Sequence, residues 1–314
     1  MKMKNLFWFI HTKTYKMRKR TSLVHFVIFA FLLFPWHARG QNRADFRYID
    51  NGEIRLGVDM SAGGSIFYFA ECKFGRNLLN HNDKGRFIQQ SYYGDIDGSY
   101  WAKQPWRWNP VQGGGYLGEP AKVLESKIRK KTLYLKSRPK HWATGVDIDS
   151  AIMETNISLK GDMARIRFRF SYFGQHSHQP CSQELPAVFV DYDLPNLVFY
   201  HGKNPWNNEA LKQVVPGWPN EAQQSDECWA AYTDSTGWGI GVYTPGTTEL
   251  TTYRFEGDGK SGPEGSACSY FAPLRKLSIT PGFVFEYDVY LTIGDTPAIR
   301  ERFYRVYSRH QNKN

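Results

Sequence analysis

The sequence has few cysteines and none of the spacings that mark a metal or disulfide framework. The four cysteines in its 314 residues are Cys72, Cys181, Cys228 and Cys268. Four thiols in a chain of this length do not make a disulfide-built scaffold, and no CxxC or paired Cys/His spacing indicates zinc. Two interpretations stay open. The thiols are buried and free, or one bridge forms, for which Cys228 with Cys268 is the preferred pair.

Several other signatures are also missing. The sequence has no phosphate-binding loop, no dinucleotide fingerprint, no Gly-x-Ser-x-Gly elbow and no His-Glu-x-x-His motif. It also has no Pro/Ser-rich linker, no low-complexity tract and no internal repeat. We therefore expect no cofactor, and a single domain is favoured over two.

Acidic residues are missing from the first part of the chain. Residues 1–40 hold eight of the 40 Lys and Arg residues and none of the 30 acidic ones, which leaves 32 basic and 30 acidic residues beyond them. The formal charge of +10 therefore belongs mostly to this segment. Because the rest of the chain is nearly neutral, its charge gives no reason to expect a nucleic-acid partner.

Residues 1–40 have the pattern of a secretory signal peptide. A basic start precedes an apolar run from Leu23 to Trp36, and the small residues Ala38 and Gly40 precede Gln41, the expected mature N-terminus. The run has 14 residues, fewer than the roughly 20 that span a bilayer as a helix, so a retained anchor is the less favoured alternative. We expect a periplasmic or extracellular protein with one domain, residues 41–314, and no membrane span after cleavage.

The rest of the chain shows the periodicity of β-strands. Residues 46–50 and 53–58 flank Asn51-Gly52, a pair that favours a type I′ hairpin turn. Residues 165–170 alternate arginines with apolar side chains, which predicts a half-buried strand. Similar alternation or short apolar runs occur at residues 187–190, 197–200, 238–243 and 283–291.

One helix is clearly signalled near the C-terminus. Thr296 can cap it, Pro297 fits its first turn, and Ile299, Phe303 and Val306 fall on one face. The sequence therefore predicts an all-β protein, a large antiparallel β-sandwich with a few short helices, one of them near the C-terminus.

Residues 77–115 combine amides, a carboxylate, an arginine and several flat aromatic rings with Gly and Pro. Polar groups bind sugar hydroxyls in pairs, and aromatic rings stack on the apolar face of a pyranose, so this composition indicates a carbohydrate site. The alternative is that the rings are core residues. The expected substrate-binding residues are Asn80, His81, Arg86, Gln89, Gln90, Tyr92, Trp106, Trp108, Asn109 and Gln112.

Four segments resemble a group of secreted bacterial proteins: residues 83–93, 108–114, 183–187 and 227–231. This resemblance implies a β-sandwich similar to the galactose mutarotase superfold, which includes sugar epimerases, glycoside hydrolase accessory domains and polysaccharide lyases. It does not match a family of known activity residue by residue. It therefore implies a fold rather than a reaction.

Glycosidic cleavage needs two carboxyl groups that flank the bond. Glu184 and Glu227 each precede an apolar β run, and Asp83 lies in the polar segment, so these three are the candidate catalytic carboxylates. We expect Glu184 and Glu227 to meet across one cleft. They can equally be solvated charges at strand ends. In a lyase, Arg86 or Arg107 would neutralise a uronate while Tyr92 or a histidine acts as base.

His176 and His178 are two residues apart and share a face if they lie in a strand. They can bind a metal with His81, His141 or His201, but solvated imidazoles in a loop are the favoured interpretation and we predict no metal site. A mutarotase-like reaction needs one histidine and one glutamate. His178 with Glu227 is one such pair, so His178 is the fourth candidate catalytic residue.

Residues 122–140 hold eight Lys and Arg residues and one acidic residue, Glu125. This stretch can attract an anionic polysaccharide, or it is an edge strand in which lysines discourage pairing between sheets.

The first hypothesis is a secreted carbohydrate-active enzyme, either a glycoside hydrolase or a polysaccharide lyase, whose partner is an oligo- or polysaccharide. The alternatives are a non-catalytic carbohydrate-binding module or lectin-like protein, and a structural envelope protein. The sequence does not identify the sugar, the linkage or the oligomeric state.

Overall fold

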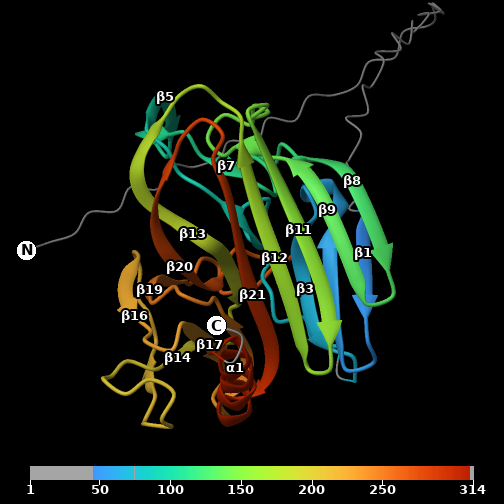
Figure 1. Ribbon diagram of the computed structural model, residues 1–314, viewed down its shortest axis with the longest axis vertical. Helices are drawn as coiled ribbons and strands as arrows, with labels where there is room; N and C mark the ends of the chain where they lie inside the picture. The colour runs from blue at the N-terminus through green and yellow to red at the C-terminus, as the bar shows by residue number, and fades with distance from the viewer. Residues whose placement is uncertain (1–44, 74, 312–314) are drawn as a thin grey trace, which may run out of the picture. The chain divides into compact units, whose positions relative to one another are not determined.

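Two large antiparallel β-sheets pack against each other in the computed structural model, which describes residues 45–311 except residue 74 (Figure 1). The predicted β-sandwich is confirmed. The α-helix α1 lies at one end of the sandwich, and β5 lies at the other. The signal peptide and the division of the chain at residue 40 lie outside the described residues and stay predictions.

The first sheet has ten strands in the order β1-β2-β3-β4-β13-β20-β19-β16, with β7 beside β4 and β10 beside β7. Its strands are β1 (Phe46–Asp50), β2 (Ile54–Asp59), β3 (Ser65–Glu71), β4 (Ile88–Ser91), β7 (Pro110–Val111), β10 (Lys140–His141), β13 (His178–Asp191), β16 (Glu221–Gln224), β19 (Glu249–Phe255) and β20 (Cys268–Ile279).

The second sheet has nine strands in the order β15-β14-β17-β18-β21-β12-β11-β9-β8. They are β8 (Lys122–Arg129), β9 (Thr132–Arg138), β11 (Ala151–Lys160), β12 (Met163–Tyr172), β14 (Asn196–Phe199), β15 (Lys212–Val214), β17 (Trp229–Thr233), β18 (Trp238–Tyr243) and β21 (Val284–Asp295). The remaining elements are the hairpin of β5 (Ile96–Trp101) and β6 (Gln104–Arg107), the 3₁₀ turn η1 (Met60–Ala62) and α1 (Thr296–Gln311).

The main core lies between the two sheets. It joins Leu56 and Phe69 of the first sheet to Ile157, Phe168 and Leu291 of the second, all of them buried. Along β12 the apolar side chains point into this core and the three arginines point outward, as the alternation at residues 165–170 predicts.

The N-terminal hairpin forms as predicted, but its turn differs. Asp50 pairs with Arg55, so the loop is longer than the two residues of a type I′ turn. Only Gly52 of the expected pair has a positive φ, at 91°. The Asn51 side chain instead accepts hydrogen bonds from the amides of Glu53 and Ile54, each 3.0 Å long. The side chain of Asn51, rather than its backbone conformation, shapes this turn.

Helix α1 buries Ile299, Phe303 and Val306, as its spacing predicts. Its capping residue is Asp295 rather than Thr296, because the Asp295 carboxylate accepts the amide hydrogen of Ala298 at 2.8 Å. The helix packs on β17, β18 and β21. Gly241 of β18 makes this possible, since a Cβ at that position would lie 2.4 Å from Ile299.

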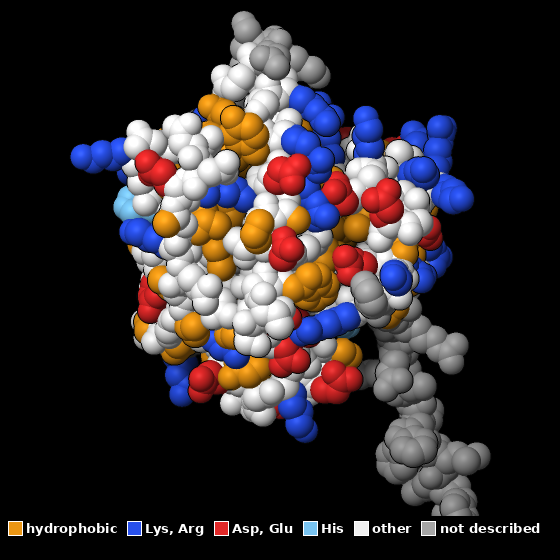
Figure 2. All heavy atoms as spheres, turned by 90° about the horizontal axis from the view of Figure 1, so that it is seen from below, with side chains coloured by type: hydrophobic (Ala, Val, Ile, Leu, Met, Phe, Trp, Pro, Cys, Tyr) orange, Lys and Arg blue, Asp and Glu red, His pale blue; other side chains and the backbone are white. Residues whose placement is uncertain are grey.

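Side chains of both charge signs lie on one face of the molecule. On the face seen in Figure 2, Lys and Arg side chains lie among Asp and Glu side chains. The basic stretch forms β8 and β9, and β8 is an edge strand of the second sheet, in agreement with the edge-strand interpretation. All four cysteines are free, so the Cys228 to Cys268 bridge does not form. Among residues 45–311, no helix has the length and apolar character to cross a bilayer.

Candidate functional site

A cavity of about 460 Å³ lies on the face of the first sheet that points away from the core. Strands β4, β7, β13, β19 and β20, several loops and the β5–β6 hairpin contribute its lining residues. Its lining residues are Asp83, Gly85, Arg86, Gln89, Ser91, Tyr93, Trp101, Trp106, Asn109, Val111, Trp142, Glu184, Ala187, Phe189, Trp218, Asn220, Tyr253, Phe255 and Tyr270.

Strand β13 carries Glu184 into this cavity by means of a bulge. Glu184 pairs with Ser91 and with Leu274, and the register on both neighbouring strands shifts between Glu184 and residues 187–188. After the bulge, Phe189 faces the cavity while Val188 and Val190 face the core. A bulge redirects a side chain without ending the strand, and such bulges are frequent beside functional sites.

The carboxyl group of Glu184 is enclosed by hydroxyl groups. It accepts a hydrogen bond of 2.6 Å from Tyr270, and Tyr93 and Ser91 also donate to it. Burial raises the pKa of Glu184 above its usual range, and the three donors oppose that rise. Burial raises the pKa of Tyr93 and Tyr270 well above the usual value, and the Glu184 charge adds to this. The tyrosines therefore stay protonated as donors.

Three tryptophans form one wall of the cavity. The ring of Trp101 lies 4.8 Å from that of Trp106 and 6.1 Å from that of Trp142, both edge-on. The indole NH of Trp106 donates to the Asn109 side chain at 3.3 Å. Asn109 in turn donates to the carbonyl of Tyr92 at 2.7 Å, so this wall is fixed to the sheet.

A second series of rings also lines the cavity and forms its second aromatic wall. Tyr270 stacks on Tyr253 at 4.4 Å, and Tyr253 meets Trp218 edge-on at 4.9 Å. Phe255 lies 5.2 Å from Trp218. Exposure rises along this series, from 2% at Tyr270 to 61% at Trp218. The wall therefore runs from the buried surroundings of Glu184 to the solvent.

Asp83 and Arg86 form an ion pair at the cavity. One oxygen of Asp83 accepts the amide hydrogens of Gly85 and Arg86 at 2.8 and 3.1 Å, and the other binds the Arg86 guanidinium. Asp83 therefore shapes its own loop and neutralises the one cation among the described lining residues.

Six of the predicted site residues lie at this cavity: Glu184, Asp83, Arg86, Gln89, Trp106 and Asn109. The hydrogen bonds of each side chain show whether it is free to bind a ligand. The Gln89 amide is fully used, because it donates to Lys84 and Gly85 and accepts from Ser65 and Gly113. It positions the loop around Asp83.

The other predicted binding residues do not line the cavity. Gln90, Tyr92 and Gln112 are buried and bond to one another, with Tyr92 stacked on Phe170 at 4.1 Å. Along the strand, these side chains alternate with side chains that face the cavity. A run of polar residues in a strand therefore places some side chains at the cavity and the others in the interior of the sandwich.

Asn80, His81 and Trp108 are also occupied by local contacts. Asn80 is buried and donates to the carbonyl of Ala267 at 2.7 Å. His81 lies edge-on to Phe67 at 5.4 Å, and burial lowers its pKa. Trp108 stacks on His178 at 4.3 Å. Trp108 also packs against the second core cluster and does not line the cavity.

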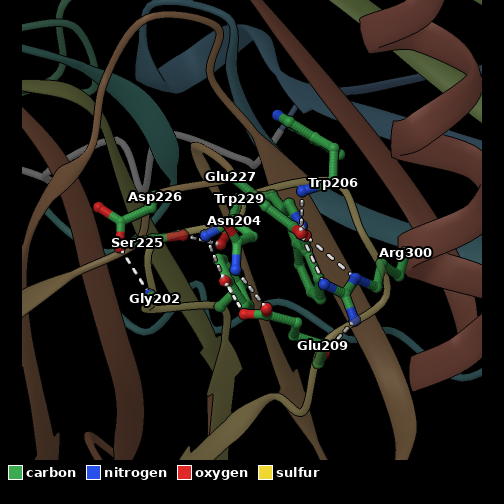
Figure 3. Close-up of polar contacts among 10 residues, drawn as sticks. Gly202, Asn204, Trp206, Glu209, Ser225, Asp226, Glu227, Trp229 and Arg300 are labelled. Atoms are coloured by element: carbon green, nitrogen blue, oxygen red, sulfur yellow. Dashed lines mark hydrogen bonds and ion pairs between the residues drawn. The ribbon is translucent and has the colours of Figure 1, made fainter.

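The structure separates Glu227 from Glu184, which corrects the expectation that they meet across one cleft. Glu227 is 0% exposed and binds Arg300 of α1 through two contacts of 2.6 and 3.1 Å. It also accepts from the Trp206 amide at 2.7 Å and the Trp229 indole at 2.8 Å. Figure 3 shows Arg300 reaching from the helix to this carboxylate. Every Glu227 contact is structural.

His178 is not paired with Glu227 either. It is buried between Trp108 and Gly94 and lies near Asp95 and His176. Asp95, His176 and His178 each bring one ligand atom within 4.8 Å of the others. However, the Nδ1 atom of His178 accepts the Asp95 amide hydrogen at 3.2 Å, which occupies its lone pair. We assign no metal to this group.

Several residues of the cavity escaped the sequence reasoning, and four of them are aromatic residues with a large share in its walls. Trp142, Trp218, Tyr253 and Tyr270 come from segments far from residues 77–115. Tyr253 and Tyr270 alternate with core residues in strands β19 and β20, where an aromatic residue predicts packing as readily as binding. Trp218 gave a weak signal, as an aromatic residue within a loop next to Gly and Pro.

No protein-family model matches the sequence, and no curated protein matches it. Solved structures do resemble the fold. A galactose mutarotase related enzyme from Lactobacillus acidophilus superposes with a TM-score of 0.53 at 10% identity, over 80% of this chain and 98% of that one. A galactose mutarotase-like protein from Lactobacillus casei gives 0.52 at 9% identity, over 79% and 100%.

A proposed aldose 1-epimerase from Escherichia coli K12 gives a TM-score of 0.51 at 12% identity, over 79% of this chain and 98% of that one. At such identities the likeness shows the fold alone. The fold is galactose mutarotase-like, as the sequence resemblance implied.

Proposed function

We propose that this protein is a carbohydrate-active enzyme that binds a neutral sugar in the cavity and uses Glu184 as its proton donor. The observation that carries the proposal is a carboxyl group with a raised pKa set between two aromatic walls. Aromatic rings bind the apolar faces of pyranoses, and the hydroxyl-rich surroundings of Glu184 supply polar partners. The similar structures include a galactose mutarotase related enzyme and a proposed aldose 1-epimerase, which adds support for a sugar ligand.

The charges of the cavity favour a neutral sugar over a uronate. Arg86 is already paired with Asp83, and Arg107 does not line the cavity. A polysaccharide lyase also needs a base to remove a carbon-bound proton. Tyr92 is buried in the sandwich, and burial raises the pKa of Tyr93, Tyr253 and Tyr270, which keeps these phenols protonated and unable to accept a proton.

A carboxyl group with a raised pKa suits the general acid of a glycosidase, which protonates the leaving oxygen. Asp83 is the second carboxylate at the cavity, and it is bound by the Arg86 guanidinium and by two backbone amides. We therefore favour hydrolysis, with Glu184 as acid and Asp83 as the charged partner.

The test is to incubate the purified protein with a panel of neutral and acidic polysaccharides. New reducing ends without unsaturated products are expected, from neutral substrates only. Products that absorb as unsaturated uronates would contradict the proposal. Loss of reducing-end release in Glu184→Gln links the activity to the cavity.

A second candidate is a carbohydrate-binding protein without turnover. One observation favours it: both oxygens of Asp83 are engaged in its own loop, and none of the described cavity residues is a histidine. Binding of a sugar without any product over long incubation would favour this second candidate.

We also propose that the protein acts outside the cytoplasm. The support is the pattern of residues 1–40, with its basic start, short apolar run and small residues before Gln41. N-terminal sequencing of exported material is expected to begin at Gln41 or within a few residues of it. Recovery of the full-length chain in a membrane fraction would contradict this.

A further inference from the structure

The volume of the cavity and the course of its aromatic walls point to a ligand longer than one sugar ring. Its volume of about 460 Å³ falls in the range of sites for drug-sized ligands, roughly 300–1,000 Å³. Its second aromatic wall advances from Tyr270 to Tyr253 and then to Trp218 in ring-to-ring steps of 4.4 and 4.9 Å. Trp218 is thus two rings away from the tyrosine that bonds Glu184.

Two tryptophans of the first aromatic wall, Trp101 and Trp106, lie on a hairpin that belongs to neither large sheet. Strands β5 and β6 pair only with each other, and most of their residues are exposed. An isolated two-stranded hairpin is marginally stable in water, so other contacts must hold it. His141 bonds Asp97 at 2.8 Å near its base, and Trp101 and Trp106 pack against each other and near Trp142.

The hairpin turn itself is strained. Trp101 pairs with Gln104, so Ala102 and Lys103 form a two-residue turn, and both have positive φ angles, 49° and 64°. Such turns normally use Asn and Gly, because other residues adopt this conformation at an energetic cost. Strained backbone is often kept where it positions a functional group. Here the turn follows directly after Trp101.

We propose that Trp101 and Trp218 form an outer subsite, so that the ligand is the end of a neutral oligosaccharide of at least two residues. This inference rests on the proposed function of the same cavity. The terminal residue lies beside Glu184, and the next one lies between Trp218, which is exposed, and Trp101, which is half-buried. Trp218 is 61% exposed, which leaves its ring available for stacking.

The inference is tested by calorimetric binding to glucose, galactose, mannose and xylose, each with its α- and β-linked dimer and trimer. For the sugar that binds, the dimer is expected to bind at least about tenfold more tightly than the monomer, the gain of roughly one well-placed ring contact. Trp218→Ala and Trp101→Ala are expected to remove this gain and to leave the affinity for the monomer unchanged.

Phe173→Ala is the matched control, because Phe173 is 59% exposed and does not line the cavity. It is expected to leave every affinity unchanged, and melting temperatures show whether the variants are folded. Equal affinities for monomer and dimer would overturn the inference and leave the proposed function intact. The inference would also be overturned if Trp218→Ala lowered the affinities for the monomer and the dimer by the same factor. Failure of every saccharide to bind would count against the proposed function itself.

Discussion

The hydroxyl of Tyr270 donates a hydrogen bond of 2.6 Å to the carboxyl group of Glu184. The two residues lie on neighbouring strands, β20 and β13, and both line the cavity. Burial raises the pKa of both groups, well above the usual value for Tyr270, so the phenol keeps its proton and acts only as a donor toward the carboxylate. This bond limits how far burial can raise the pKa of Glu184.

Tyr270→Phe removes that donor without changing the shape of the ring. The pKa of Glu184 is expected to rise further, because Tyr270 is the strongest of the interactions that lower it. The alkaline limb of the pH profile of sugar turnover should therefore move to higher pH. Tyr253→Phe is the control, since its ring faces the cavity but has no bond to Glu184. A limb that moves to lower pH, or that moves equally in the control, would contradict the prediction.

Glu184→Gln should lose turnover by about 10²–10⁴-fold, the usual contribution of a general acid, while sugar binding persists. The variant also has a stability signature. A carboxyl whose pKa is raised on folding stabilises the protein below its unfolded value of about 4.3, and this contribution is lost as the pH rises through the folded pKa. In the wild-type protein this loss lowers the melting temperature as the pH rises from the unfolded pKa to the folded pKa of Glu184. In Glu184→Gln the melting temperature should fall less over the same pH range. Near-normal turnover would exclude Glu184 as the acid.

The sequence predicted the fold better than the site, for a physical reason. Alternation with period two reports which side chains face a core, as at Arg165, Arg167 and Arg169 of β12, which are exposed as expected. It does not report whether the outer face meets solvent or a cavity. Tyr270 is therefore indistinguishable from a packing residue until β20 is placed beside β13.

A partner far along the chain explains why Glu227 does not lie where the sequence predicted. Glu227 precedes an apolar strand just as Glu184 does, but its carboxylate bonds Arg300, which lies 73 positions further along the chain. No local pattern encodes that partner. The turn at Ala102 and Lys103 shows the same limit, because neither residue is typical of a hairpin turn.

The ion pair of Glu227 and Arg300 should matter for stability and not for sugar chemistry. Both side chains are at least 90% buried, and the pair joins α1 to the segment of Trp206 and Trp229. Glu227→Gln leaves the Arg300 charge buried without its partner, so the free energy of unfolding should fall by about 3–5 kcal/mol.

Two further variants make this test specific. Glu301→Gln, at an exposed position on α1, should change the free energy of unfolding by less than about 0.5 kcal/mol. The double variant Glu227→Gln with Arg300→Met should be less destabilised than Glu227→Gln alone, because no buried charge is left over. Denaturant unfolding measures all three. A fall in turnover at unchanged stability in Glu227→Gln would show that the structural assignment is wrong.

His178 should make the protein sensitive to mild acid. Its ring is buried against Trp108, its Nδ1 atom accepts the Asp95 amide hydrogen, and its Nε2 atom is buried without a partner. Burial, and then the charge of His176, lower the pKa of His178, although Asp95 and Asp97 oppose this. A histidine whose pKa is lowered on folding stabilises the protein fully above its unfolded value of about 6.5. That contribution is lost as the pH falls from there through the folded pKa.

The free energy of unfolding should therefore decrease between about pH 6.5 and the folded pKa of His178, by up to about 1.4 kcal/mol for each pH unit. His178→Phe keeps a flat ring against Trp108 and removes the titration, so the slope in this window should become smaller. His201→Gln is the control, because His201 is exposed and lies beside Asp226 instead. Urea unfolding at a series of pH values measures the slopes. An unchanged slope in His178→Phe would show that other groups cause the acid sensitivity.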